Sequence, residues 1–243
     1  MRFLLHQCEN TQARFGADAR LLLLGLLLPL SACGSDTSPT FGADSEEVDE
    51  SAQKQTAGAN ATSSSDCDAS GNFAATSGGN AWAWNASTNQ WYGLSTSSSS
   101  PLMLVGSCGN FAVTDGSAAY AWSKTTNQWL GLSISSPSKL IGDGGNFVVT
   151  NSVSAFAWNA STNQWYGLSI PSPSDAKGSG GNFAVINGSA AYAWNKTTNQ
   201  WGEISISSPN NLIGDGGNFV VTNNSTAYAW NASTNQWYGL SIP

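Results

Sequence analysis

The chain has 243 residues and a formal net charge of −7, and only 9% of its residues are charged. Its arginines and its single histidine all precede Cys33, and only five lysines follow that residue. A surface with so few cations cannot neutralise a phosphate backbone, so we expect no nucleic-acid partner. The composition instead favours a protein that is rich in turns and aromatic side chains, with 26 glycines and 11 tryptophans.

A short apolar run, Leu21–Cys33, follows Arg14 and Arg20 near the start of the chain. It is too short to span a bilayer and has the pattern of a secretory signal peptide. Its end, Leu30-Ser-Ala-Cys33-Gly34, resembles the lipobox of bacterial lipoproteins. The resemblance implies a signal peptide over 1–32, cleavage before Cys33, and acylation of the Cys33 thiol with chains such as palmitate. An ordinary secretory signal is the alternative.

The residue after the cysteine is Gly34 rather than Asp. By resemblance to Gram-negative lipoproteins, this favours an anchor in the outer membrane, on either its periplasmic or its surface face. Residues 33–65 are then acidic, rich in Ser and Thr, and almost without large apolar side chains. Such a segment cannot bury enough surface to offset its ordering entropy, so we expect a disordered tether.

Residues 66–243 contain five copies of one unit. Its most regular part is Trp158-Asn-Ala-Ser-Thr-Asn-Gln-Trp165, and the first Trp recurs at positions 84, 122, 158, 194 and 230. A period of about 36 residues is the mark of a repeat architecture. Short β-branched and aromatic runs alternate with clusters of Gly, Asn, Ser and Pro, which predicts strands and turns and no helix.

In the third copy the expected strands are 139–141, 146–150, 154–158 and 164–170. The alternation Ala119-Tyr-Ala-Trp122, repeated in other copies, puts bulky side chains on one face of a strand and small apolar ones on the other. Such strands suit sheets that are covered on both faces. We therefore predict an all-β fold, a β-propeller of five short four-stranded blades of about 36 residues, with an open β-repeat array as the alternative.

Two motifs carry a resemblance to known families. The spacing in Trp-Asn-x-Ser/Thr-Thr-Asn-Gln-Trp is similar to the kelch signature, and Leu140-Ile-Gly-Asp-Gly-Gly145 followed by Phe resembles the blades of tachylectin and tectonin lectins. Both resemblances imply a β-propeller over roughly 67–243. The lectin likeness implies a carbohydrate-binding module of the cell envelope, and the kelch likeness implies a protein–protein interaction scaffold as the alternative.

The second Trp of each unit stands beside Asn and Gln at a turn, which provides an aromatic ring with neutral donors and acceptors. That combination suits sugars, whose C–H faces stack on rings while their hydroxyls bond amides. The alternative is that both tryptophans are core and that Asn forms the turn. The candidate ligand-binding residues are Trp91, Trp129, Trp165, Trp201, Trp237, Asn89, Gln90, Asn163, Gln164, Asn235 and Gln236.

We expect no catalysis, metal or cofactor. Without histidine after Cys33, base chemistry would fall to a few scattered carboxylates. Asp143 and Asp215 occupy equivalent Gly-Asp-Gly-Gly turns one or more periods apart, where they serve turn formation or, as a minor alternative, a Ca²⁺ contact. Cys67 and Cys108 begin adjacent repeats, where they form a disulfide or are two small buried residues.

Overall fold

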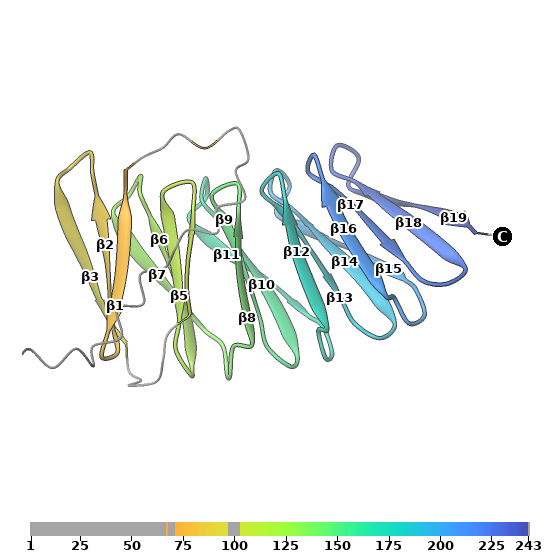
Figure 1. The fold of residues 1–243 in the computed structure, drawn as a ribbon, viewed down its shortest axis with the longest axis horizontal. Coiled ribbons are helices and arrows are strands. Elements are labelled where there is room, and N and C mark those ends of the chain that lie inside the picture. The colour runs from red at the N-terminus through yellow and green to blue at the C-terminus, as the bar shows by residue number, and fades with distance from the viewer. Residues whose placement is uncertain (1–66, 68–70, 97–102, 243) are drawn as a thin grey trace, which may run out of the picture. The chain divides into compact units, whose positions relative to one another are not determined.

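The computed structural model describes residue 67 and residues 71–96 and 103–242. These residues form five antiparallel sheets that follow one another in chain order, and they contain no helix (Figure 1). The prediction of an all-β fold built from propeller-type blades is confirmed. The predicted signal peptide (1–32), Cys33 and the tether (33–65) lie outside the described residues. Among the residues that the structure does describe, no helix is long and apolar enough to cross a membrane.

The sheets are referred to as first to fifth in chain order. Four of them have four strands, as predicted, whereas the described part of the first has three. The strands are β1 (Phe73–Ser77), β2 (Asn80–Asn85) and β3 (Gln90–Ser95); β4 (Met103–Ser107), β5 (Asn110–Thr114), β6 (Ala118–Ser123) and β7 (Gln128–Ser133); β8 (Lys139–Asp143), β9 (Asn146–Thr150), β10 (Ser154–Asn159) and β11 (Gln164–Ser169); β12 (Asp175–Ser179), β13 (Asn182–Ile186), β14 (Ala190–Asn195) and β15 (Gln200–Ser205); β16 (Asn211–Asp215), β17 (Asn218–Thr222), β18 (Thr226–Asn231) and β19 (Gln236–Ser241).

Each sheet is a simple meander in which successive strands pair by hairpins. The turn between β8 and β9 consists of Gly144 and Gly145, whose φ angles are 52° and 85°. Positive φ at both central residues defines the two-residue turn that matches strand twist, and glycine adopts it without steric cost. The longer turn between β10 and β11 contains Asn163, also at positive φ. Both turns lie at one end of the sheet, which we call the Trp-turn end.

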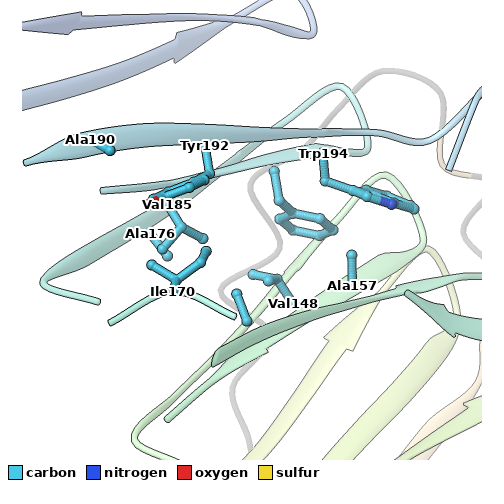
Figure 2. Close-up of a cluster of buried hydrophobic side chains, with 10 residues drawn as sticks. Val148, Ala157, Ile170, Ala176, Val185, Ala190, Tyr192 and Trp194 are labelled. Carbon is cyan, nitrogen blue, oxygen red and sulfur yellow. The ribbon is translucent and has the colours of Figure 1, made fainter. Parts of the chain in front are cut away.

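Adjacent sheets pack a bulky face against a small one, as the alternation predicted. In the third interface, Phe183, Val185 and Trp194 of the fourth sheet contact Val148 and Ala157 of the third (Figure 2). The ring centroids of Phe183 and Trp194 lie 5.9 Å apart. All five of these side chains are buried. Each sheet is thus stabilised mainly by apolar area that its neighbours remove from water.

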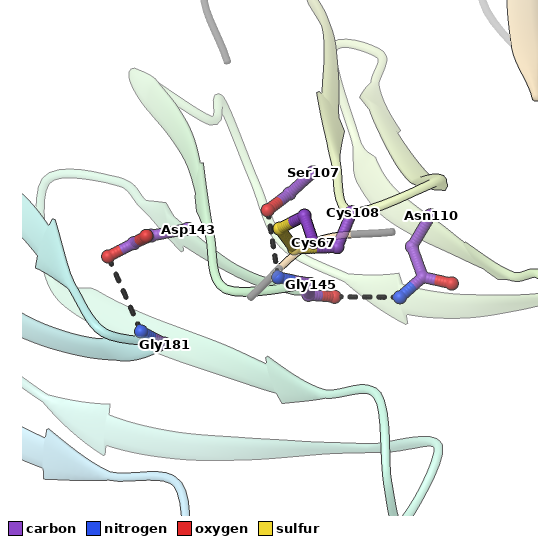
Figure 3. Close-up of a disulfide and its surroundings, with 7 residues drawn as sticks. All are labelled: Cys67, Ser107, Cys108, Asn110, Asp143, Gly145 and Gly181. Carbon is purple, nitrogen blue, oxygen red and sulfur yellow. Dashed lines mark hydrogen bonds between the residues drawn. A yellow bond between two sulfur atoms is a disulfide. The ribbon is translucent and has the colours of Figure 1, made fainter. Parts of the chain in front are cut away.

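The glycine turns of neighbouring sheets also lie against each other. A Cβ atom on Gly144 would come within 2.6 Å of Gly181 Cα, and one on Gly180 within 2.8 Å of Gly217 Cα. The N–H of Gly145 donates to Ser107 Oγ at 2.9 Å, which ties the second turn to the third (Figure 3). The repeated Gly-Gly pair is therefore needed for two reasons: the turn has positive φ angles, and the turns of successive sheets approach closely.

The two end sheets are covered on one face only. Phe73 and Trp91 on the first sheet and Tyr238 and Leu240 on the fifth are exposed. Ring closure between the first and fifth sheets is therefore not seen in the described residues, which matches the open form that the repeats also allow.

Candidate functional site

The first tryptophan of the repeated motif is a core residue. Trp122, Trp158, Trp194 and Trp230 are fully buried, whereas Trp84, on the half-covered first sheet, is partly exposed. Within the described residues, the buried indole N–H groups have no hydrogen-bond partner. These side chains are therefore present for their apolar volume and do not offer a contact to a ligand.

The second tryptophan links adjacent sheets. The indole N–H of Trp129 donates to Tyr92 O at 3.0 Å, and that of Trp201 to Tyr166 O at 3.2 Å. Trp165 and Trp237 make the same bond to the preceding sheet, at 3.3 Å each. Of these five tryptophans only Trp91 is largely exposed, because no sheet precedes it within the described residues. Four of the five predicted stacking residues are thus half-buried, with their N–H groups already used.

The predicted asparagines are turn residues. Asn89, Asn163 and Asn235 have φ values of 55°, 52° and 55°, the left-handed conformation that asparagine tolerates well. The buried side-chain oxygen of Asn163 has no partner within the described residues. In the equivalent position one period later, Asn199 accepts from the Asn159 amide at 2.6 Å. Ser123, which has no amide to donate, stands where Asn159 does in the preceding repeat; Asn235 likewise lacks this bond, although Asn195 stands opposite it.

The predicted glutamines lie at the exposed surface of the same end. Gln90, Gln164 and Gln236 each accept a hydrogen bond from the tyrosine hydroxyl two residues on, at 3.2, 3.2 and 3.3 Å. In the third sheet, Tyr166 OH also bonds Thr162 Oγ1 at 3.1 Å. Within the described residues the amide N–H groups of these glutamines have no hydrogen-bond partner, whereas their oxygens accept from tyrosine.

Between the Trp-turns of the third and fourth sheets lies an open groove with a volume of about 480 Å³. Its walls are amides, hydroxyls, backbone and one cation. The lining residues are Gly144, Asn146, Asn159, Ala160, Ser161, Thr162, Lys196, Thr197 and Asn199. None of the predicted ligand residues lines it, although Thr162 connects it to Tyr166 and Gln164.

The groove is built by hydrogen bonds that also hold the sheets together. The Asn146 amide donates to Gly181 O at 2.8 Å, and its oxygen accepts from Ala160 N at 2.8 Å. The Asn159 amide donates to Lys196 O at 2.7 Å. The groove walls are therefore held rigidly by the same contacts that stack the sheets, so the site is preformed.

One carboxylate lies near the groove. Asp143 is buried, and burial raises its pKa above the ordinary value of 3.8. The backbone N–H groups of Gly181 and Gly144 and the charge of Lys196 lower this pKa but do not cancel the effect of burial. The Gly181 N–H donates to Asp143 Oδ2 at 3.4 Å (Figure 3). Asp143 thus replaces the serine that makes this bond in the second and fourth sheets.

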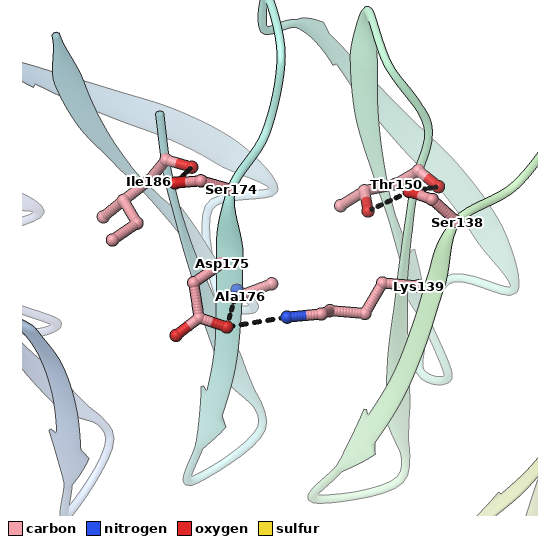
Figure 4. A network of polar contacts seen from close by, with 7 residues as sticks. All are labelled: Ser138, Lys139, Thr150, Ser174, Asp175, Ala176 and Ile186. Carbon is pink, nitrogen blue, oxygen red and sulfur yellow. Dashed lines mark hydrogen bonds and ion pairs between the residues drawn. The ribbon is translucent and has the colours of Figure 1, made fainter. Parts of the chain in front are cut away.

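The other acidic positions serve structure. Asp175 pairs with Lys139 at 2.6 Å across the third and fourth sheets (Figure 4). Burial raises the pKa of Asp175, but the hydrogen bond from Lys139 and the nearby positive charges outweigh it, so that the pKa is lowered overall. Asp215 is exposed at the turn of the fifth sheet. Among the described residues, no three His, Cys, Asp or Glu side chains gather as a metal site would require.

Cys67 and Cys108 are joined as a disulfide in the structure (Figure 3). Cys108 follows β4, and Cys67 lies in the position that Val105 occupies one repeat later. The bond ties the start of the repeat region to the second sheet, beside the Gly145 turn.

The groove residues Asn146, Lys196 and Thr197 were not predicted from the sequence. The signal that could have found them is the Asn that begins the second strand of four repeats, at positions 110, 146, 182 and 218, and that directly precedes β1 at position 72. A polar residue repeated at the start of a strand indicates a bond to a neighbouring copy. The sequence does not say which copy.

No family model matches the chain, and no curated protein matches it. Solved structures with a similar fold include apo AztD from Citrobacter koseri (TM-score 0.40, 10% identity, 70% of this chain and 59% of that chain). Another is the N-terminal domain of Nup159 (TM-score 0.37, 13% identity, 70% of this chain and 58% of that chain). A third is a chain of the mitotic checkpoint complex (TM-score 0.38, 10% identity, 68% of this chain and 59% of that chain). The chain spans less than two thirds of the length of each, and the likenesses assign no function to it.

Proposed function

We propose that the protein is a non-catalytic carbohydrate-binding module that binds a glycan of the cell envelope in the groove between the third and fourth sheets. The observation that carries the proposal is the lining of that groove: the exposed hydroxyl side chains of Ser161, Thr162 and Thr197 border one open groove of about 480 Å³, whose walls are held in place by the buried amides of Asn146 and Asn159. Ligand sites are concave and contain a few convergent polar groups, as this one does.

The chemistry of the lining favours a polyhydroxylated, mostly neutral ligand. Sugar hydroxyls both donate and accept hydrogen bonds, so amides and hydroxyls satisfy them without a strong charge. Lys196 adds a single positive charge, which suits a glycan that carries an occasional acidic group. The exposed amide of Gln164, whose N–H groups have no partner within the described residues, extends the polar surface beyond Thr162. The tryptophans contribute less than the sequence predicted, because most of their indole N–H groups bond the backbone.

A matched pair of variants tests this proposal. Ser161 lines the groove and is exposed, and Ser233 is its exposed counterpart in the fifth sheet, where no further sheet of the described residues forms an opposite wall; both variants are compared in dilute, monomeric protein. We expect Ser161→Arg to abolish binding of the best glycan from an array of cell-wall sugars and lipopolysaccharides, and Ser233→Arg to leave it unchanged. Isothermal titration measures both. Absence of any binding across the array would refute the proposal, and so would equal loss in the two variants.

The proposal includes an outer-membrane lipid anchor at Cys33, supported by the lipobox resemblance of Leu30–Cys33. Two acyl chains on one cysteine anchor a protein stably, and removing them releases it. Mass spectrometry of the mature N-terminus is expected to find an acylated Cys33, and Cys33→Ala is expected to move the protein from the membrane to the soluble fraction. An unmodified Cys33 would contradict this part alone and leave the groove proposal intact.

A protein-binding scaffold is the second candidate, and it is favoured by the exposed apolar faces of the first and fifth sheets. Large exposed apolar patches mark interaction sites. Recovery of a stoichiometric envelope protein with the wild-type chain, and its loss when those faces are made polar, would favour this function over glycan binding.

A further inference from the structure

The first and fifth sheets leave unlike faces uncovered. The first sheet exposes its bulky face, where Phe73 is 64% and Trp91 55% exposed. The fifth sheet exposes its small face, including the outer side of β19, where Tyr238 is 51% and Leu240 68% exposed. We call these the N-face and the C-face. An uncovered apolar face of this kind marks an interaction surface, and here the two faces differ in shape.

The N-face and the C-face are the two halves of an interface that the chain already builds four times. In the three contacts between the second and fifth sheets, the Phe and two Trp of one repeat pack on the small apolar residues of the preceding repeat. Phe73 and Trp91 are the N-face copies of Phe183 and Trp201. Val220 and Ala229 are the C-face copies of Val148 and Ala157, against which the fourth sheet packs (Figure 2).

Groups that form hydrogen bonds across the interior interfaces have counterparts on the two end sheets, and there these counterparts have no partner among the described residues. Between the third and fourth sheets, Trp201 Nε1 donates to Tyr166 O and the Asn146 amide donates to Gly181 O. The corresponding donors at the ends are Trp91 Nε1 on the N-face and the Asn218 amide on the C-face, and neither has an acceptor within the described residues.

Their expected acceptors are on the opposite face. The copy of Tyr166 O is Tyr238 O, on the C-face, and the copy of Gly181 O is Gly71 O, on the N-face. A third such pair is the Asn231 amide with Ala86 O, which repeats the bond from Asn159 to Lys196 O. Donors and acceptors left over at one end thus match those left over at the other, residue by residue.

We propose that the protein assembles head to tail, with the N-face of one copy covering the C-face of another. Within one chain both faces are uncovered at once, so a second copy is the occupant that the interior interface specifies. On the N-face, Phe73 and Trp91 are more than half exposed, and on the C-face Tyr238 and Leu240 are, so each copy would contribute large apolar side chains to the contact. A contact between unlike faces repeats and yields rings or filaments.

The test uses two variants of the full chain, each with one face made polar: Trp91→Asp for the N-face and Leu240→Asp for the C-face. All samples share one detergent buffer, and light scattering after size exclusion gives their masses. The wild-type mass is expected to rise with concentration to at least twice that of one chain. Each variant alone is expected to stay monomeric, since every junction would include one altered face.

An equimolar mixture of the two variants is the decisive sample. The Trp91→Asp chain retains an intact C-face and the Leu240→Asp chain an intact N-face, so the mixture is expected to form dimers and nothing larger. Val153→Asp, at an exposed loop outside both faces (Val153 is 59% exposed), is expected to assemble like the wild type. Formation of the mixed dimer also shows that both variants are folded.

Three results would overturn the proposal. One is a mixture that remains monomeric. Another is a wild-type chain that is monomeric at every concentration and whose Trp91 is shielded from a soluble quencher, which would mean that the two faces meet within one chain. The third is disordered aggregation that the Trp91→Asp and Leu240→Asp variants share with the wild type.

Discussion

The fourth and fifth sheets have nearly the same strand pattern but very different surroundings. Every residue of β13 and β14 in the fourth sheet is buried, whereas only two residues of β17 and one residue of β18 in the fifth sheet are buried. Ala193 is buried under the aromatic face of the next sheet, and its copy Ala229 is exposed. Burial in this molecule is therefore set by the neighbouring copy more than by the residue itself.

The largest difference between interior and end is expected at tryptophan. Trp194 is fully buried between two sheets, so Trp194→Ala should lower the free energy of unfolding by about 3–5 kcal/mol. Trp91→Ala, at the uncovered N-face, should cost about 1 kcal/mol or less in dilute protein. Urea denaturation followed by circular dichroism compares them. Equal costs would mean that the N-face is covered within one chain.

The glycine turns give a second matched pair. Gly180 and Gly216 have the same φ, 54° and 53°, but a Cβ on Gly180 would meet Gly217, whereas one on Gly216 would meet nothing. Gly216→Ala should cost only the left-handed strain, about 1–2 kcal/mol. Gly180→Ala adds overpacking of about 1–3 kcal/mol. Thermal unfolding of both variants measures the difference, which should disappear if successive turns do not touch.

A third comparison uses pH and the two aspartates of the Gly-Asp-Gly-Gly turns. Because burial raises the folded-state pKa of Asp143, its ionisation opposes folding as pH rises from 3.8 through the raised value. Asp143→Ser, which restores the residue of the second and fourth sheets, should raise stability at neutral pH by about 1 kcal/mol and make it less dependent on pH. Unfolding curves between pH 3.5 and pH 7, chosen as about the range of that titration, measure this.

The control for that prediction is Asp215→Ser. Asp215 is exposed at the glycine turn of the fifth sheet, and within the described residues no sheet packs on it from the C-terminal side. The same substitution there is expected to change stability little at any pH. A gain at Asp215 as large as that at Asp143 would show that the turn, and not burial by the next sheet, causes the effect.

The smallest effect is expected at the ion pair between Lys139 and Asp175, whose side chains are each 41% exposed. Lys139→Met should cost about 0–1 kcal/mol, since exposed pairs contribute little. The lowered pKa of Asp175 means that its contribution is present above pH 3.8 and is lost as pH falls through the lowered value. The loss of unfolding free energy caused by Lys139→Met should therefore vanish in strong acid and in high salt. Denaturation at neutral pH in low salt, in strong acid, and in high salt would check this.

Much of the fold follows from the sequence. The strands of the third repeat were predicted from alternation and turn chemistry, which are local properties; the turn role of Asn163 and the core position of Trp158 were the alternative to ligand binding at this motif. The groove and the indole bond of Trp201 were not, because both depend on contacts between residues about one period apart. A repeat sequence specifies what such an interface contains but not which copies form it, and so ring closure could not be decided either.

Hydrogen exchange of the dilute, monomeric chain, resolved by strand, tests most directly whether neighbouring copies determine burial. We predict that amides of β9, β10, β13 and β14 exchange most slowly and those of β1, β3 and β19 fastest, with protection of the end strands rising as concentration increases. Equal protection of all five sheets at the lowest concentration would contradict the account, because the two ends would then already cover each other.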